Sequence, residues 1–415
     1  MFDIATETKL FNDFISPGVI GQIFAQSKLE GIIKKSDKLV LGGMLAKQKV
    51  MVGASQAARA ASDSGYPGAQ QSTPEETLIK LKRAMMFSVK FDGFALAAAA
   101  KGGTPLDPYE FEKQGILMTV IDDLSRQLIS DGSGRIAQVN SAGGVSGTTT
   151  IPIDSPYWTK LTRFLKKDRI IDIYNAAHTL QLDARKIVSA TDTQIVVEAP
   201  NVTLDDDAYI RNEKTYAASE GAGTGECMGL LGIISNLDPP YPNAAAGLQG
   251  LLVGSYPDWA AIVKSNGGVK RPLSEDLLIS AIDEIEGGMT TVMLITHKIR
   301  RAWAAYLRNF KTIDKEVLWG GFSGLPFYYD GKVIPMVPDK FVPDAQILGA
   351  DEDKLTIYVT QEGQEITWEK GRDGSFLQKV AGKNEFVAEG HIFQNMGVST
   401  RKAFWKVTDL QEPLT

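Results

Sequence analysis

The residues with the most familiar chemistry in this sequence do not form a catalytic pattern. The stretch GAGTGEC, residues 221–227, has alternate glycines, as phosphate-binding loops do. However, Glu226 stands where the last glycine of G-x-G-x-x-G would be, no convincing strand precedes the stretch, and no G-x-x-x-x-G-K-S/T loop occurs in the chain. We therefore interpret it as a flexible connector, with a nucleotide site as the alternative.

Metal binding and nucleophilic catalysis have little support. The chain has three histidines, His178, His297 and His391, which lie in three different predicted regions without an H-E-x-x-H or Cys-His spacing. The single cysteine, Cys227, lies beside Gly and Met, so a small buried hydrophobic residue is the better interpretation than a nucleophile. We predict no catalytic residue, no cofactor and no metal.

Two charged clusters remain. Three carboxylates at 205–207 lack the glycine and distal glutamate of a calcium loop, so we expect a solvated turn before a strand. Residues 298–311, KIRRAWAAYLRNFK, predict an amphipathic surface helix, with contact to a subunit or to DNA as the alternative. Its expected inward residues are Ile299, Trp303, Tyr306 and Leu307, and its expected outward residues are Arg300, Arg301 and Arg308.

Length and composition are those of a folded protein with a sizeable core. The chain has 415 residues, 43% of them hydrophobic and 23% charged. A formal net charge of -6 argues against a main surface that binds nucleic acid, although contact with packed DNA on one face stays open. One cysteine permits no intrachain disulfide, which favours a reducing cytoplasm. No apolar run approaches the roughly 18 residues that span a bilayer, so no membrane partner is expected.

The first predicted element is a hairpin with a polar tip. KQKVMVG at 47–53 predicts a strand, whereas residues 54–76 contain no Leu, Ile, Val, Phe, Trp or Met. Residues 77–91 then alternate with period two, which predicts one long, half-buried strand. Its apolar face would contain Ile79, Leu81, Met85, Phe87, Val89 and Phe91. An isolated hairpin is marginal in water, so this one must pack against something else.

A long helix is predicted over residues 107–131. Asp107 can cap it, Pro108 suits its first position, and Asp131 with Gly132 would end it. At 1.5 Å per residue, such a helix is about 36 Å long. Its apolar positions at helical spacing are Leu117, Ile121, Leu124 and Leu128.

Three further regions complete the chain. Short β-rich runs over 157–216 predict a small antiparallel barrel or sandwich. Within 226–351, Ser274 can cap a helix, and the strand TTVMLIT is followed directly by another helix, which predicts an α/β unit. The apolar residues of the first of these helices are Leu278, Ile282 and Ile285. Long strands are expected at the C-terminus.

The order of these elements resembles that of the major capsid proteins of tailed bacteriophages, which have the HK97-like fold. The local patterns that carry the resemblance are EFEKQGILMTVIDDLSRQLISDGSG, ECMGLLGIISNL, TTVMLITHKIRRAWAAY and GFSGLPFYYDGKVIPMVPDKFVPDAQILGAD. It implies an α+β chain with an N-terminal arm (1–46), an extended E-loop hairpin (47–92) and a peripheral P domain (93–150) with a spine helix (107–131). An inserted β-rich subdomain (151–216), an axial A domain (217–351) and C-terminal P-domain strands (352–415) would follow.

The resemblance also implies a function. Such a protein self-assembles through hexamers and pentamers into an icosahedral or prolate head shell around double-stranded DNA, and it is not an enzyme. It is found in the virion and assembles in the host bacterial cytoplasm, with portal and decoration proteins as further partners. No long charged helical region precedes the arm, so a separate scaffolding protein or none is expected. The alternatives are an encapsulin-like compartment shell and an α/β nucleotide-binding enzyme.

In this interpretation the hairpin contacts a neighbouring subunit. A polar tip cannot build its own core, so packing on another copy must offset an ordering cost of about 1 to 2 kcal/mol per residue. The hypothetical contact residues are Arg59, Lys80, Lys82, Arg83 and Lys90, and a solvated basic strand face is the alternative. No motif fixes a lysine-asparagine pair, so covalent crosslinks between subunits are not predicted.

Overall fold

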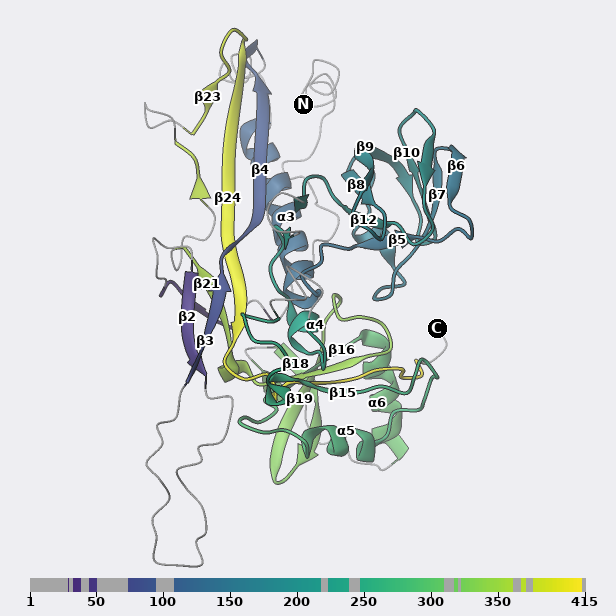
Figure 1. Ribbon diagram of the computed structural model, residues 1–415, viewed down its shortest axis with the longest axis vertical. Coiled ribbons are helices and arrows are strands. Elements are labelled where there is room, and N and C mark those ends of the chain that lie inside the picture. Colours follow the sequence, from purple (N-terminus) through teal and green to yellow (C-terminus); the bar gives the residue numbers. More distant parts are fainter. Residues whose placement is uncertain are drawn as a thin grey trace, which may run out of the picture.

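The chain has a mixed α+β fold that is rich in strands and has few helices (Figure 1). The structure is a computed structural model. It describes residues 29, 33–38, 45–50, 74–94, 108–217, 223–238, 247–309, 317–319, 322–360, 367–370 and 376–412. Among these residues, no helix is long and apolar enough to cross a membrane.

A long sheet packs against helix α3 (Pro108–Ile129) along one side of the molecule (Figure 1). Its central strand is β24 (Glu385–Val398), which pairs along most of its length with β4 (Lys82–Asp92). The other strands of this sheet are β1 (Lys34–Ser36), β21 (Leu355–Val359), β22 (Thr367–Trp368) and β23 (Gln378–Lys379).

The run at 77–91 that predicted one strand is divided between two. Strand β3 (Glu75–Lys80) pairs with β2 (Leu45–Val50), and β4 pairs instead with β24. The alternation itself is confirmed, because Ile79, Val89 and Phe91 are buried. The pairing with β24 extends from Lys82 to Asp92, whereas β2 pairs with six residues of β3.

Helix α3 confirms the predicted long helix within two residues at its C-terminal end. Leu124 and Leu128 are buried, as the helical spacing predicts. Asp107, the predicted cap, lies outside the described residues. An unpredicted feature is that the last two turns are buried on every side, polar residues included.

The predicted β-rich segment is a closed six-stranded barrel. Its strands, in order around the barrel, are β10 (Gln194–Val197), β7 (Thr150–Asp154), β5 (Ala137–Val139), β12 (Tyr209–Asn212), β8 (Ile170–Tyr174) and β9 (Leu180–Ala190). Its first strand precedes the expected start at residue 151. Two small pairs adjoin it: β6 (Val145–Thr148) with β11 (Val202–Leu204), and β13 (Tyr216–Ala217) with β14 (Gly223–Thr224).

A seven-stranded sheet forms the α/β unit. Its order is β15 (Ile262–Lys264), β25 (Trp405–Val407), β20 (Ile347–Ala350), β16 (Val292–Ile295), β19 (Lys332–Pro338), β18 (Phe322–Tyr329) and β17 (Val317–Trp319). Strand β25 departs from the predicted grouping, because it leaves the other C-terminal strands and joins this sheet.

The helices of this unit begin where the sequence predicts. Ser274 caps α5 (Glu275–Ile282), its side chain accepting a hydrogen bond of 3.4 Å from the Leu277 amide. Helix α6 (His297–Asn309) follows β16 directly, and its Ile299 and Trp303 are buried in the same cluster as Leu278 of α5. The short helices are α4 (Leu230–Ile233), η1 (Leu161–Arg163), η4 (Pro257–Trp259) and η5 (Glu352–Lys354).

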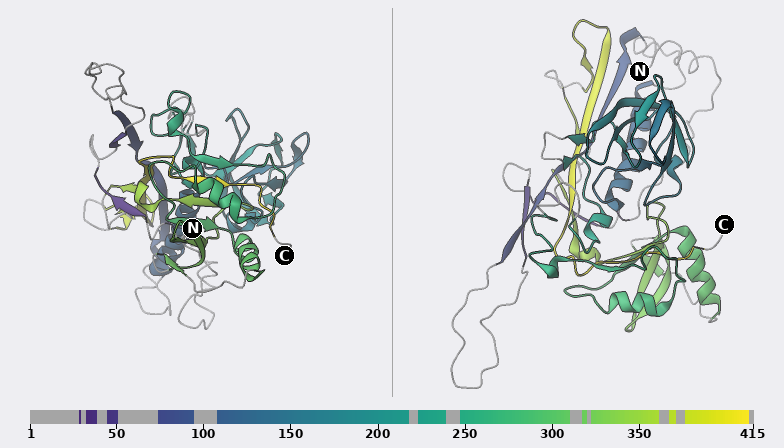
Figure 2. Two further views of the ribbon diagram at one scale, coloured as in Figure 1. Left: turned by 90° about the horizontal axis from the view of Figure 1, so that it is seen from below. Right: turned by 45° about the vertical axis from the view of Figure 1, so that its right-hand side comes forward.

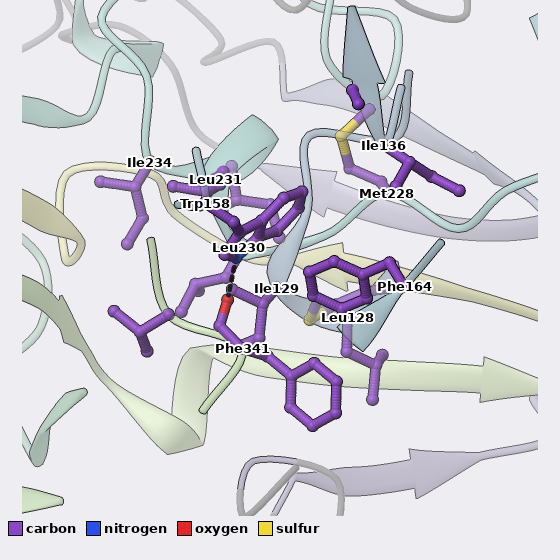
Figure 3. Packing of buried hydrophobic residues seen from close by; sticks show 14 of the residues in the cluster. Leu128, Ile129, Ile136, Trp158, Phe164, Met228, Leu230, Leu231, Ile234 and Phe341 are labelled. Atoms are coloured by element: carbon purple, nitrogen blue, oxygen red, sulfur yellow. Dashed lines mark hydrogen bonds between the residues drawn. The ribbon is translucent and has the colours of Figure 1, made fainter. Parts of the chain in front are cut away.

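One hydrophobic core joins these parts. The barrel lies beside α3, and the seven-stranded sheet lies below both of them (Figures 1 and 2). Where they meet, Trp158 packs near Leu128 and Ile129 of α3 and donates a hydrogen bond of 2.8 Å from its Nε1 to the Phe341 carbonyl (Figure 3). Phe164 and Phe341 complete this contact. The barrel is therefore packed against the body of the chain by apolar contacts.

Candidate functional site: a strand ribbon and the polar junction behind it

The β2–β3 pair, called the ribbon below, has one buried and one outward face. Ala46 pairs with Ile79, and both are 1% exposed. On the other face Lys47 pairs with Leu78, whose side chain is 43% exposed. Because successive strand residues point to opposite sides, the same pattern that buries Ile79 turns Leu78 and Lys80 outward. The ribbon thus presents an amphipathic outer surface.

The base of the ribbon rests on its own chain. The Leu78 amide donates to the Gln249 carbonyl at 2.9 Å, and the Tyr256 hydroxyl donates to Glu75 Oε1 at 2.8 Å. Asn395 Nδ2 donates to the Lys80 carbonyl at 2.7 Å. The expectation that the hairpin depends wholly on another subunit is therefore wrong for its base. Residues 51–73, which include most of the polar stretch, lie outside the described residues.

The structure describes the side chains of three of the five predicted contact residues. Lys80 is exposed on β3, whereas Lys82 is half-buried on β4. Lys90, also on β4, forms an ion pair of 2.6 Å with Glu385 of β24, so its charge is balanced within the chain. Arg83 belongs to β4, but its side chain is outside what the structure describes, as is the whole of Arg59.

Behind the ribbon, the buried end of α3 carries a charged network that we call the polar junction, formed by Asp123, Arg126, Arg169 and Glu226. The side chain of Arg126 is fully buried and donates from Nε to Asp123 Oδ1 at 3.2 Å. It also makes a two-pronged contact with Glu226, which includes Nη1 to Oε2 at 3.1 Å. Such forked contacts match the planar guanidinium to a carboxylate.

The polar junction connects α3 to the barrel and to the long sheet. From the barrel side, Arg169 Nη2 donates to Asp123 Oδ1 at 2.8 Å. Beside it, Gln127 of α3 donates to the Ala84 carbonyl of β4 at 2.9 Å and accepts from the Cys227 amide at 3.1 Å. One buried cluster therefore fixes the relative positions of the helix, the barrel and the sheet.

Electrostatics within the junction act differently on its two acids. Burial raises the pKa of Asp123, but the guanidinium groups of Arg126 and Arg169 outweigh it and hold that pKa well below its usual range. Burial lowers the pKa of Arg126, and the carboxylates of Asp123 and Glu226 more than restore it. For Glu226, burial raises the pKa more than the Arg126 guanidinium lowers it. Arg126 is thus the charge on which both acids depend.

The described part of GAGTGEC is not a flexible connector. Gly223 and Thr224 form β14, and the following Glu226 and Cys227 are buried. A Glu226 carboxylate that turns inward to Arg126 does not suit a phosphate loop, because it would repel the anion. The interpretation of Cys227 as a small buried hydrophobic residue is confirmed, since burial raises the pKa of its thiol to about 12. The sequence signal that could have revealed the junction is Arg126 within an apolar helical repeat.

The other charged clusters behave as expected. Residues 205–207 are exposed immediately before β12, which confirms a solvated turn. In α6, Ile299 and Trp303 point into the core and Arg301 is exposed, which confirms an amphipathic surface helix. Arg300, expected to face outward, is half-buried, and the side chain of Arg308 lies outside what the structure describes. Within the part of the chain that the structure describes, no three His, Cys, Asp or Glu side chains are placed to hold a metal ion.

Comparison with known proteins identifies the fold. No protein-family model matches the chain, and no curated protein matches it. Among solved structures, the capsid of cyanophage A-1(L) matches with a TM-score of 0.54 and 11% identity over 99% of both chains. The SrpI encapsulin of Synechococcus elongatus (TM-score 0.49, 9% identity, 100% and 99% covered) and the capsid of a native GTA particle (TM-score 0.47, 12% identity, 98% of both) are more distant.

The cyanophage match defines a class of protein by its fold. The cyanophage likeness runs through both whole chains, so this chain has the α+β fold of a phage capsid protein. The resemblance to phage capsid proteins seen in the sequence is confirmed at the level of the fold.

Proposed function

We propose that this chain is a major capsid protein that self-assembles into the head shell of a tailed phage, icosahedral or prolate, around double-stranded DNA. The observation that carries the proposal is the likeness to the cyanophage capsid over 99% of both chains. The protein would act through geometry and interface energy rather than through catalysis.

The finer assignment follows the element order. The ribbon with the residues between its strands would be the E-loop, and α3 with the β4–β24 sheet would be the P domain. The seven-stranded sheet would be the A domain, the barrel an inserted subdomain, and the residues before the ribbon the N-terminal arm. Hexamers and pentamers, DNA on the inner face, and scaffolding, portal and decoration proteins would be the partners, with assembly in the host cytoplasm.

Weak contacts would suffice for such a shell. The outer surface of the ribbon offers Leu78 and Lys80 to a neighbour, while its base stays fixed to its own chain. A contact repeated over a closed symmetric lattice adds up to a large total stability, although each single contact can dissociate and correct errors.

The test is to express the chain, alone and together with the proteins encoded beside it, and to examine it by sedimentation and negative-stain microscopy. We expect closed particles, and DNA rather than enzyme cargo inside those formed in the presence of the phage packaging proteins. Cargo-filled particles would instead indicate an encapsulin-like compartment. A discrete small oligomer that binds nucleotide would refute the shell function.

A loop variant makes this test sharper. Replacing residues 54–73 by a short Gly-Ser linker should abolish closed particles while circular dichroism and the melting temperature stay unchanged. The matched control is Val188→Ser, which alters an exposed apolar residue of the barrel and should leave assembly intact. Normal particles from the loop variant would contradict the role assigned to the E-loop.

A further inference from the structure

The ribbon leaves the long sheet at the point where β3 joins β4 (Figure 1). Strand β4 pairs with one edge of β24 as far as Lys82, which lies opposite Gln394. In the part of the chain that the structure describes, no strand pairs with this edge of β24 from Asn395 to Val398, although β21 pairs with the other edge. Backbone groups on a buried strand need partners, so something other than a strand has to supply them here.

The side chain of Gln249 supplies these partners at Val398. The next residue, Ser399, donates from its amide to the Lys354 carbonyl of the other edge at 3.1 Å, so Val398 turns its own backbone groups the opposite way. There the Gln249 amide nitrogen donates to the Val398 carbonyl at 3.0 Å, and the Gln249 amide oxygen accepts from the Val398 amide at 2.7 Å. This orientation of the side-chain amide is the one that satisfies both of its ends. The glutamine therefore pairs with β24 as one residue of a strand would.

The backbone of the same glutamine binds the ribbon. The Gln249 carbonyl accepts from the Leu78 amide at 2.9 Å, on the edge of β3 that β2 leaves open. We call the contacts of Gln249 with Val398 and Leu78 the Gln249 bridge. Asn395 of β24 donates to the Lys80 carbonyl, so β3 is held at two points. One contact would let the ribbon turn about it, whereas two contacts fix its direction.

The loop that carries Gln249 is itself held firmly. Leu248 and Leu251 are buried in the main hydrophobic core, and Trp259 Nε1 donates to the Leu248 carbonyl at 3.2 Å. A Cβ atom at Gly247, where φ is +64°, would collide with the Leu251 carbonyl. Gln249 has a φ of 57°, a conformation that suits Gly, Asn or Asp better. A glutamine at this position points to a requirement for its longer side chain.

We propose that the Gln249 bridge sets the direction in which the ribbon leaves the sheet, and that this direction determines whether copies close into particles of one size. The proposal rests on the shell function above. The bridge joins the two diverging strands through one residue of a firmly held loop, so it fixes the separation between them. In a symmetric assembly each copy repeats the same contact, so a small change in direction is repeated at every subunit and alters the curvature.

Shortening the side chain tests the bridge. Gln249→Asn suits the backbone conformation, but its amide is one methylene too short to reach Val398. In the soluble chain the Leu78 amide should exchange its hydrogen about tenfold faster than in the parent, while the barrel amide of Ile187 should not change. The fraction of closed particles of the parent diameter should fall about tenfold, as measured by negative-stain microscopy. The matched control is Gln194→Asn, which shortens an exposed glutamine of the barrel.

A pH-dependent variant distinguishes positioning from general stability. In Gln249→Glu a protonated carboxyl group can donate to the Val398 carbonyl and accept from the Val398 amide, whereas the ionised group can only accept. Because it faces a carbonyl, its pKa should lie above the value of about 4.3 of a free glutamate. Slow exchange at Leu78 and closed particles should be present below that pKa and lost above it. The parent and Gln194→Glu, measured at the same pH values, correct for other groups of the ribbon base such as Glu75.

The outcomes distinguish this proposal from the shell function. If the parent forms no closed particles, the shell function is wrong, and hydrogen exchange at Leu78 in the soluble chain still decides whether the bridge holds the ribbon. If Gln249→Asn exchanges as the parent does, the bridge is wrong and the shell function stands. Faster exchange with normal particles would mean that the bridge does not direct assembly, which also overturns the proposal. Faster exchange with loss of closed particles, both reversed at low pH in Gln249→Glu, supports it.

Discussion

The barrel and the ribbon differ in how they treat strand edges, whose unpaired backbone groups can bind another chain. Every barrel strand has two neighbours, and Ile187, Ile195 and Ile210 fill an interior closed to solvent. In the part of the chain that the structure describes, β2 pairs only with β3, and Leu78 faces outward. Closure removes edges that would otherwise pair with other chains. The barrel is thus complete within one chain, whereas the ribbon has surface left for a partner.

The polar junction joins the barrel to the helix and to the sheet that the ribbon contacts through Asn395. It connects α3 to the barrel through Arg169 and lies next to Gln127, which binds β4. If the ribbon has to meet a neighbour in a defined position, then the helix and sheet behind it must not move. A buried ion-pair network can serve this purpose by fixing register rather than by adding stability.

The largest effect is expected from breaking that network. Arg126→Ala leaves Asp123 and Glu226 buried without their shared counter-charge, which should lower the free energy of unfolding by about 3–5 kcal/mol. Denaturant unfolding followed by circular dichroism measures this loss. Arg126→Lys retains the charge but not the forked contact. Its free energy of unfolding should therefore lie between those of the parent chain and of Arg126→Ala. A loss below about 1 kcal/mol would mean that water satisfies the two acids.

A matched pair of apolar truncations tests the comparison itself. Ile195→Ala opens a cavity in the closed barrel and should cost about 2–4 kcal/mol of stability in the isolated chain. Leu78→Ala removes a side chain that is 43% exposed, so the isolated chain should unfold as before while particle assembly weakens. Equal destabilisation by both would show that the outer face of the ribbon is already part of the chain's own core.

The sequence predicts a helix or strand well where a local signal, such as a cap or one buried face, determines it. The start of α5 follows from Ser274, and the alternation from Ile79 to Phe91 follows from burial of one strand face. The spacing of short strands predicts a barrel or a sandwich, but it does not reveal the start at Ala137, because a three-residue strand gives too short a pattern.

What sequence reasoning missed depends on contacts between distant residues. Nothing local connects Arg126 with Glu226, which are 100 residues apart in the chain. The division of the run at 77–91 was missed for the same reason, since β24 begins at residue 385. Periodicity indicates which face of a strand is buried, but it does not identify the strand that pairs with it.

A smaller and pH-dependent effect is expected at Cys227. Its folded pKa of about 12 lies above the value of 9.0 for a free thiol, so its stabilising contribution is complete below pH 9 and decreases as the pH rises toward 12. Relative to Cys227→Ala, the parent chain should therefore lose stability as the pH rises through that window. If the free energies of unfolding of the parent chain and of Cys227→Ala depend on pH in the same way, the thiol is accessible to water.

The smallest effect concerns how firmly the ribbon base rests on its own chain. Tyr256→Phe removes the hydroxyl that donates to Glu75 but keeps the ring. Because the half-buried ring of Tyr256 keeps its packing, the melting temperature should not change, yet the Leu78 amide, bonded to the Gln249 carbonyl, should exchange its hydrogen faster. Hydrogen exchange read at Leu78, with the barrel amide of Ile187 as the internal reference, measures this. Faster exchange at both sites would mean that the ribbon and the barrel open together. The two regions would then differ in how their strand edges are covered, but not in local stability.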